Sequence, residues 1–337
     1  MKKVYIDFEM NMPNNKGKKD MLNADIIAIG AIKYDECTGE VEKFKSLIKP
    51  IIKKEVYPHI EELTKITSHD LYKAPTYEEV MRDFKCWLGI FSEIKGIYTF
   101  GNLDLACFSN IDKISSQKNK HPRFLNNIKD LFVDIKDKYV DYGIRCMNYI
   151  SLKNLLSIAN VEFSGEVHDP LDDAYNLYLL DSILDENESI RDLLIIKDII
   201  KPPFNTIDEN LETKFEMYKE YFYKKEGSYD INFISIEIIK VVRKYILSLK
   251  NIEINNIEIL KDISKKLISI EKLSNIEEGY FYILENLCLD MKDLLDDLML
   301  YKLNLEEYKN EITNIIELFD EDLEAEEINI RTDNILI

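Results

Sequence analysis

The spacing of apolar residues changes character once along the 337-residue chain, and this change limits the fold more than any other feature. Up to about residue 190, short apolar runs typical of strands alternate with segments of helical spacing. From about residue 205 onward the strand signals fade and only helical spacing remains. We therefore expect an α/β domain over residues 1–190 and an all-α domain over residues 204–337. The Lys201-Pro202-Pro203 stretch between them has the composition of a linker.

The first domain is expected to begin with three meandering strands and to continue with alternating helices and strands. Thr76 and Glu79 have the spacing of a capping box, Ser151 is a good N-cap, and Asp169-Pro170 reads as an N-cap followed by a first-turn proline. The order of elements predicts a mixed sheet flanked by helices. The expected strands cover residues 3–9, 26–34, 41–48, 94–100 and 130–134, and the expected helices begin near residues 76, 104, 151 and 169.

The second domain is expected to be a bundle of helices. An aromatic cluster at Tyr218, Tyr221, Phe222 and Tyr223 is explained as well by core packing as by stacking of nucleic-acid bases. The expected helices cover residues 208–225, 231–250, 256–272, 276–301 and 304–325.

Charge is distributed unevenly between the two domains. The formal net charge is −19, of which residues 1–180 carry −2 and residues 181–337 carry −17. Phosphate backbones repel a strongly acidic surface, so the second half is not expected to offer a broad nucleic-acid-binding face. A solvated acidic surface is its simplest explanation, and a protein-binding surface is the alternative.

The composition points to a cytoplasmic protein. No apolar run approaches the roughly 18–20 residues that span a bilayer, and Asp7 and Glu9 interrupt the apolar start, which argues against a secretory signal. The five cysteines form no C-x-x-C pair, so neither a zinc site nor a disulfide framework is expected. We therefore predict a location in the reducing cytoplasm and no membrane partner.

Acidic residues stand where a metal-dependent phosphoryl-transfer site would need them. Asp7 and Glu9 are two residues apart on an expected strand, so both side chains project from one face. Two carboxylates on a buried strand repel each other unless cations lie between them. Asp104 follows a later strand, where a side chain can reach a crevice at the strand ends. Taken alone, Asp7 and Glu9 are better explained by a strand end where acids reach solvent, and Asp104 by an ordinary acid at a helix N-terminus.

A third group of polar residues lies at the start of the last helix of the first domain. His168 stands five residues before Asp173, across the transition from loop to helix. That spacing allows both side chains to serve one site. A surface histidine and an ordinary first-turn acid are the alternative explanation for the pair.

The order of these groups resembles the DnaQ-like 3′–5′ exonucleases, which have the DEDDh pattern of active-site residues and a ribonuclease H-like fold. Residues 64–91 look like the family's "LTGI…AP…EEV…F..WL" segment, and Ser151–Leu155 looks like its "SLK.L" segment. Residues 168–174 are similar to its "H.ALDDA" motif, with Pro170 in place of the usual alanine. The family often has an aromatic residue where Leu103 stands. The resemblance covers roughly residues 1–185.

The opening Asp-Phe-Glu, with Met12-Pro13 after it, looks most like the KapD-type and RNA-interference-type exoribonuclease branch. The resemblance implies two Mg²⁺ or Mn²⁺ ions held by carboxylates and a histidine general base. It also implies contacts to the terminal nucleotide. The implied metal ligands are Asp7, Glu9, Asp104 and Asp173, the implied base is His168, and the implied substrate contacts are Met10, Asn11, Phe100 and Asn102.

These observations lead to the hypothesis of a cytoplasmic, Mg²⁺- or Mn²⁺-dependent 3′–5′ exonuclease acting on the 3′ ends of single-stranded RNA or DNA. One alternative is a proofreading exonuclease subunit of a DNA polymerase, which predicts that a polymerase copurifies. The other is an interaction protein that binds a partner through its acidic helical domain. That alternative predicts that residues 200–337 alone capture a protein.

Overall fold

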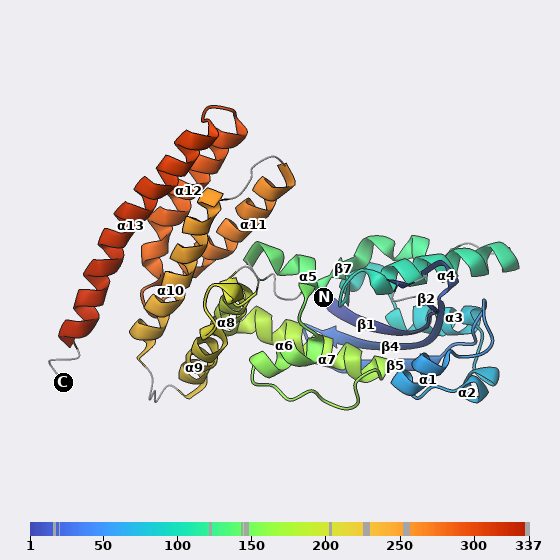
Figure 1. Cartoon of the computed structure of the whole chain (residues 1–337). Coiled ribbons are helices and arrows are strands. Elements are labelled where there is room, and N and C mark those ends of the chain that lie inside the picture. Colours follow the sequence, from blue (N-terminus) through green and yellow to red (C-terminus); the bar gives the residue numbers. More distant parts are fainter. Residues whose placement is uncertain are drawn as a thin grey trace. The chain divides into compact units, whose positions relative to one another are not determined.

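The computed structural model describes residues 1–15, 18–19, 21–120, 123–142, 144, 148–201, 204–224, 230–251 and 257–333. The chain divides into two compact units (Figure 1). The first comprises residues 1–139 and 147–186, and the second comprises residues 140–146 and 187–337. The predicted limits at residues 190 and 204 stay predictions. Pro202 and Pro203 of the expected linker lie outside the described residues.

The first unit is built on a five-stranded sheet with the order β5-β4-β1-β6-β7. β1 pairs antiparallel with β4, and β4 pairs antiparallel with β5. β1 pairs parallel with β6, and β6 pairs parallel with β7. The predicted mixed sheet is thus confirmed. The strands are β1 (Lys2–Asn11), β4 (Asp25–Asp35), β5 (Val41–Leu47), β6 (Ile94–Thr99) and β7 (Phe132–Asp134), while β2 (Asn14–Asn15) and β3 (Lys18–Lys19) form a separate pair.

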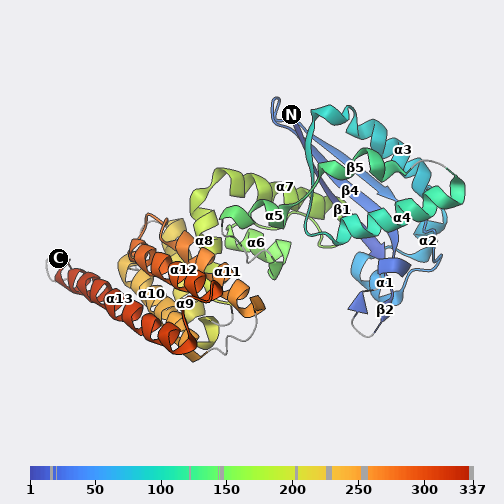
Figure 2. The ribbon, with the colours of Figure 1, turned by 90° about the horizontal axis from the view of Figure 1, so that it is seen from above.

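Helices cover both faces of this sheet, as Figures 1 and 2 show for α4 and α7. The helices of the first unit are α1 (Pro58–Thr64), α2 (Ser68–Tyr72), α3 (Tyr77–Leu88), α4 (Leu103–Asn119), α5 (Ile135–Lys138), α6 (Leu152–Ile158) and α7 (Pro170–Glu186). The capping box of Thr76 with Glu79 is present at the start of α3. The Ser151 side chain accepts a hydrogen bond from the N–H of Asn154 at the start of α6, as predicted.

The alternation of side chains along β1 decides which layer each residue meets. Val4, Ile6 and Phe8 belong to the main apolar core, which includes residues of α3 and α4. The intervening residues face α7: the Tyr5 hydroxyl donates to the Asp181 carboxylate over 2.7 Å. Asp7, two residues further along, is directed to the same side. The strand therefore presents its acids to the layer that contains α7.

The second unit is a set of helices around an apolar centre. They are α8 (Glu188–Ile199), α9 (Leu211–Lys224), α10 (Ile231–Ser248), α11 (Ile257–Leu273), α12 (Leu284–Met299) and α13 (Leu305–Asp333). Tyr218 is fully buried and packs against Phe222 and Phe281, with ring centroids 4.9 Å and 5.9 Å apart. For Tyr218, core packing is therefore the correct explanation. α8 was not predicted as a separate helix.

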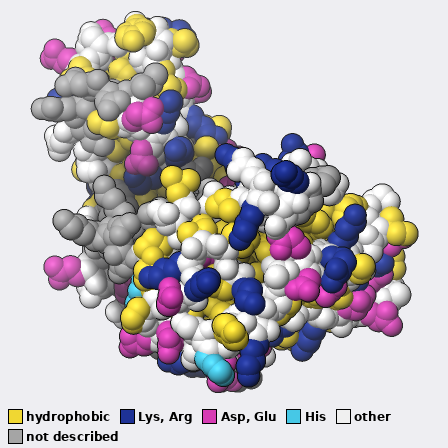
Figure 3. All heavy atoms as spheres, turned by 90° about the vertical axis from the view of Figure 1, so that its right-hand side faces the viewer, with side chains coloured by type: hydrophobic (Ala, Val, Ile, Leu, Met, Phe, Trp, Pro, Cys, Tyr) yellow, Lys and Arg dark blue, Asp and Glu magenta, His cyan; other side chains and the backbone are white. Residues whose placement is uncertain are grey.

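Two surface properties bear on partners. On the face shown in Figure 3, lysine and arginine side chains of the described residues lie among aspartate and glutamate side chains. Within the described residues, none of the helices combines the length and the apolar composition needed to cross a bilayer.

Candidate active site

The first two acids of the site come from β1. Asp7 and Glu9 are on the same face of the strand, and Glu9 is only 7% exposed. The pairing with β4 shifts register between Glu9 and Met10, which marks a local irregularity of the strand at this point. Asp7 pairs in register with Gly30 of β4. The alternation that predicts a shared face for the two acids is thus present in the structure.

Asp104 approaches from the other layer. It lies in the first turn of α4, soon after β6 ends at Thr99, and is 7% exposed. Because β1 and β6 are parallel neighbours, the chain leaving β6 starts α4 near the same end of the sheet. Two elements far apart in the sequence therefore direct carboxylates to one place.

The start of α7 supplies the last two groups. The Asp169 carboxylate accepts hydrogen bonds from the N–H groups of Leu171 (3.1 Å) and Asp172 (3.3 Å), which agrees with the predicted N-cap. The His168 N–H donates to the Asp173 carboxylate over 2.9 Å. His168 has φ 68°, in the left-handed region that costs a non-glycine residue about 1–2 kcal/mol. The bond to Asp173 helps offset that strain and holds the histidine beside the acid.

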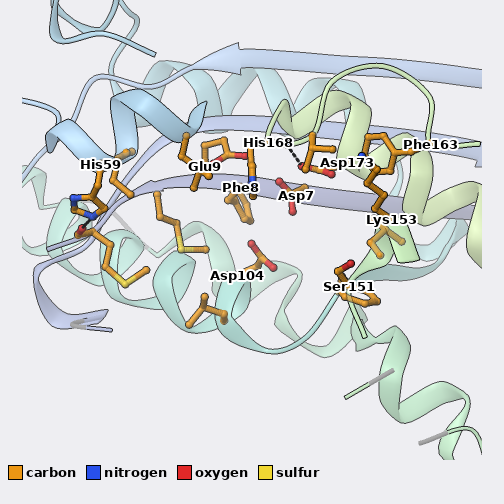
Figure 4. Close-up of a pocket in the computed structure, with 18 of the residues that line it drawn as sticks. Asp7, Phe8, Glu9, His59, Asp104, Ser151, Lys153, Phe163, His168 and Asp173 are labelled. Carbon is orange, nitrogen blue, oxygen red and sulfur yellow. Dashed lines mark hydrogen bonds between the residues drawn. The ribbon is translucent and has the colours of Figure 1, made fainter. Parts of the chain in front are cut away.

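All five predicted catalytic residues line one cavity of about 880 Å³ in the first unit. Figure 4 shows Asp7, Glu9, Asp104, His168 and Asp173 grouped in its middle. Candidate ligand atoms of Glu9, His168 and Asp173 lie within 4.8 Å of one another. The structure thus brings together residues that are up to 166 positions apart in the sequence.

The electrostatics of the cavity favour a bound cation. Burial raises the pKa of Asp7 well above its usual range, and the negative charges of Asp104, Glu9 and Asp173 raise it further. Burial, with the charges of Asp173 and Asp104, raises the pKa of Glu9 to about 8. Burial also raises the pKa of Asp173 to about 6. Oxygen-rich, mutually repelling carboxylates are the donor set that Mg²⁺ or Mn²⁺ suits, so the residues present fit such ions.

A stability measurement checks these shifts in the metal-free protein. The folded pKa of Glu9 lies above the unfolded value, so the folded state binds more protons and loses stability as the pH rises from about 5 to 8. In chelator, Tm should fall over this range, and Glu9→Gln should reduce the fall. Saturating Mg²⁺ should raise Tm more at pH 8 than at pH 5. An equal fall in wild type and Glu9→Gln would contradict the assignment.

Gly30 allows α7 to approach the strand that pairs with β1. A Cβ atom added at Gly30 would overlap the backbone of Pro170 and Leu171. The first turn of α7 therefore rests directly on β4, opposite the position of Asp7. This contact sets the distance between the acids on β1 and the His168–Asp173 segment. Backbone atoms cannot make room by rotating about a side-chain bond, so no larger residue fits at position 30 without moving α7.

Gly30→Ala is expected to lower kcat by about 100-fold, because a displacement of roughly 1 Å is enough for such a loss. It should also weaken Mn²⁺ binding, which calorimetry measures independently of turnover. Gly96→Ala is the matched control, since the atoms nearest to an added Cβ there belong to the side chain of Tyr98, at 3.1–3.2 Å, and not to a backbone. A folded Gly30→Ala protein with wild-type kcat and Mn²⁺ affinity would contradict the role of Gly30.

The four predicted substrate contacts are placed differently. Met10 and Phe100 line the cavity, whereas Asn11 and Asn102 are not among the described residues that do. The Asn11 side chain is 1% exposed; its amide donates to the Glu55 carbonyl (3.0 Å) and accepts from the Tyr57 N–H (2.9 Å). Asn11 therefore holds the segment that leads into α1. Asn102 is the exposed residue that precedes α4.

Several lining residues were not singled out from the sequence. α1 contributes His59, Ile60 and Leu63, and α6 with the segment after it contributes Lys153 and Phe163. Lys153 belongs to the "SLK.L" segment, so its position beside the predicted helix cap could have drawn attention to it. Nothing in the local pattern marks His59, because α1 reaches the cavity only through tertiary packing.

The family comparison agrees with this fold and site. The RNase_T family model, described as Exonuclease, matches residues 4–180, more than half of the chain. The protein therefore belongs to this exonuclease family, and its mixed five-stranded sheet flanked by helices is the ribonuclease H-like fold. It is accordingly a nuclease that hydrolyses ester bonds. The predicted family is confirmed, while the KapD-type branch stays a prediction.

Among solved structures, the nuclease domain of 3′hExo, a DEDDh family member bound to rAMP, is 20% identical with a TM-score of 0.46; the match covers 55% of this chain and 92% of that one. Exonuclease I of E. coli in complex with a dA16 oligonucleotide is 14% identical with a TM-score of 0.41. That match covers 57% of this chain and only 42% of Exonuclease I. No curated protein sequence matches the chain significantly.

Proposed function

We propose that the protein is a divalent-metal-dependent 3′–5′ exonuclease that removes nucleotides from the 3′ end of single-stranded RNA or DNA. The observation that carries this proposal is the convergence of Asp7, Glu9, Asp104, His168 and Asp173 on one open cavity. A cavity of about 880 Å³ suits the unpaired end of a strand. Residues 1–180 are near neutral, so this half itself exerts little long-range repulsion on a phosphate backbone.

The four carboxylates would hold two Mg²⁺ or Mn²⁺ ions. When bound, such ions neutralise charge on the scissile phosphate and stabilise the attacking and leaving oxygens. Asp7 and Glu9 would orient the ions from β1, and Asp104 and Asp173 from the two flanking helices. The raised pKa values of Asp7, Glu9 and Asp173 describe the protein without a cation, and a bound cation favours the ionised carboxylates.

His168 would act as the general base. Burial lowers the pKa of its imidazole, so the ring is neutral at pH 7 and one ring nitrogen can accept a proton from the attacking water. The hydrogen bond from its backbone N–H to Asp173 fixes the base beside a metal-binding carboxylate. An acidic limb in the pH profile of kcat, below the usual histidine value of about 6.5, follows from this assignment.

The test uses RNA and DNA strands of one sequence, labelled at the 5′ end, with Mg²⁺, Mn²⁺ or chelator. The proposal predicts a ladder of shortened products with metal, no products in chelator, and protection by a 3′-phosphate. A circular single strand is the control and should remain intact. Intact linear strands in the presence of metal, or equal cleavage of the circle, would overturn the proposal.

The ladder assay also measures whether RNA or DNA is cleaved faster, because the cavity residues do not favour either substrate. A cytoplasmic location and a protein partner for the acidic helical unit stay predictions from composition. A proofreading role would require a copurifying polymerase.

A further inference from the structure

The cavity continues past the carboxylates in two directions, and its two ends differ in chemistry. His59 lies at one end, with Met12 in contact with it and Leu63 on the same helix α1, and Ser151, Lys153 and Phe163 lie at the other end (Figure 4). Figure 4 places Asp7, Asp104 and Asp173 between these ends. A strand lying across the acids would therefore meet different groups on the two sides of the bond that is cut.

Lys153 distinguishes the second end. It is the one lysine or arginine among the described residues that line the cavity. Its side chain is exposed and takes part in no hydrogen bond or ion pair with the described part of the chain. α6 itself is firmly held, because Leu155 and Leu156 are fully buried and Ser151 caps the first turn. Lys153 is thus a cation on a firmly held helix, at the edge of an acidic site and with no partner among the described residues.

Among the described residues that line the cavity, the opposite end has no comparable cation. Met12 and Leu63 are apolar, and the Nε2 atom of His59 lies 3.1 Å from the Met12 carbonyl oxygen. This ring nitrogen is therefore already in contact with a backbone carbonyl oxygen. This end suits a nucleoside that has no further phosphate, which is the condition of the last nucleotide at a 3′-hydroxyl end.

We propose that Lys153 binds the internucleotide phosphate immediately 5′ to the scissile one, and that the strand therefore leaves the site along α6. This inference rests on the proposed function. A strand that continues on the 5′ side brings one negative charge per nucleotide, and an ammonium group binds a phosphate as a point charge. Phe163, beside Lys153, offers an aromatic face for the base of that nucleotide.

The experiment changes the phosphate and the lysine separately and together. Oligonucleotides carry either a phosphate or a neutral methylphosphonate at the second linkage from the 3′ end. The proteins are wild type, Lys153→Gln, Lys153→Arg and the control Lys85→Gln, which removes an exposed lysine of α3 outside the cavity. The readouts are kcat, KM and the dependence of kcat/KM on salt.

In wild type, the methylphosphonate should lower kcat/KM about tenfold, mainly through KM. Lys153→Gln should show the same loss with the normal strand and no further loss with the methylphosphonate, because both changes remove one contact. The slope of log kcat/KM against log salt should fall by about 0.7 in Lys153→Gln, the value for one phosphate of a single strand. Lys153→Arg should retain most of the activity, and Lys85→Gln all of it.

Two outcomes separate this inference from the proposed function. If wild type removes 3′ nucleotides but Lys153→Gln has unchanged kcat/KM, or remains as sensitive to the methylphosphonate as wild type, the role of Lys153 is overturned and the exonuclease remains. If wild type with metal removes no nucleotide from any strand, the proposed function itself is overturned.

Discussion

Replacing Asp7 by asparagine is expected to lower the nuclease rate by at least about a thousandfold and, in chelator, to raise the Tm of the protein by several degrees. The loss of rate follows because a carboxylate at the centre of the cavity would contribute to both metal binding and transition-state charge stabilisation. The gain in stability follows because burial and four neighbouring carboxylates disfavour a charge at this position. A neutral amide of the same shape removes that unfavourable interaction.

The measurements are single-turnover cleavage of a 5′-labelled strand and thermal unfolding with and without Mg²⁺. Metal should raise the Tm of Asp7→Asn less than that of wild type. Asp83→Asn is the matched control, since Asp83 lies on α3 with its side chain 67% exposed, away from the cavity. A folded Asp7→Asn protein that cleaves within tenfold of the wild-type rate would remove Asp7 from the site.

Replacing His168 by alanine is expected to lower kcat by about 10²–10⁴-fold, the usual range for loss of a general base. Metal binding should be largely kept, because the four carboxylates remain and the backbone N–H that bonds to Asp173 is still present. The acidic limb of the kcat profile should disappear in the residual activity, since the group that titrates there is gone.

A pH series of single-turnover rates from pH 5 to 9 measures this effect, with His69→Ala as the control. His69 is an exposed residue of α2 that does not line the cavity. Alanine is at least as unfavourable as histidine in the left-handed region, so the His168→Ala substitution does not relieve the backbone strain at this position. A change in rate would therefore not result from a relaxed turn. Unchanged kcat and an unchanged acidic limb would assign the proton transfer to another group.

Local patterns were enough to predict much of the first unit, and together with the family resemblance they predicted the five candidate residues that line one cavity. The two-residue spacing of Asp7 and Glu9 places them on one face of β1 because strand side chains alternate. The caps at Thr76, Ser151 and Asp169 are local hydrogen bonds, so their spacing alone predicts helix starts close to those observed. Residues whose roles depend on short-range geometry could therefore be recognised directly from the sequence.

Residues whose roles depend on contacts with distant segments could not be recognised from the sequence. Asn11 follows the acidic motif, yet its amide bonds to the backbone of Glu55 and Tyr57, more than forty positions away. Gly30 has its role only because the start of α7 lies on it. A lone glycine inside an apolar strand was the available signal for close backbone approach, but it does not say which segment approaches.

The second unit also has features that the sequence did not predict. Helical spacing predicted five of its helices close to their observed positions, but not α8. The acidity of this half was visible in the sequence, whereas the burial of Tyr218 in its centre depends on helices α9 and α10 and on Phe281. The acidity thus describes the surface of this unit, and the role of the unit stays a prediction.

The carboxylates of the first unit are proposed to form a divalent-metal site that the nuclease reaction requires. Titration calorimetry of chelator-treated protein with Mn²⁺, compared between wild type and Asp7→Asn, tests for this site. We expect about two ions per wild-type chain, and for Asp7→Asn binding weakened by tenfold or more or reduced to fewer ions. No Mn²⁺ binding by the wild type, or identical binding by Asp7→Asn, would contradict it.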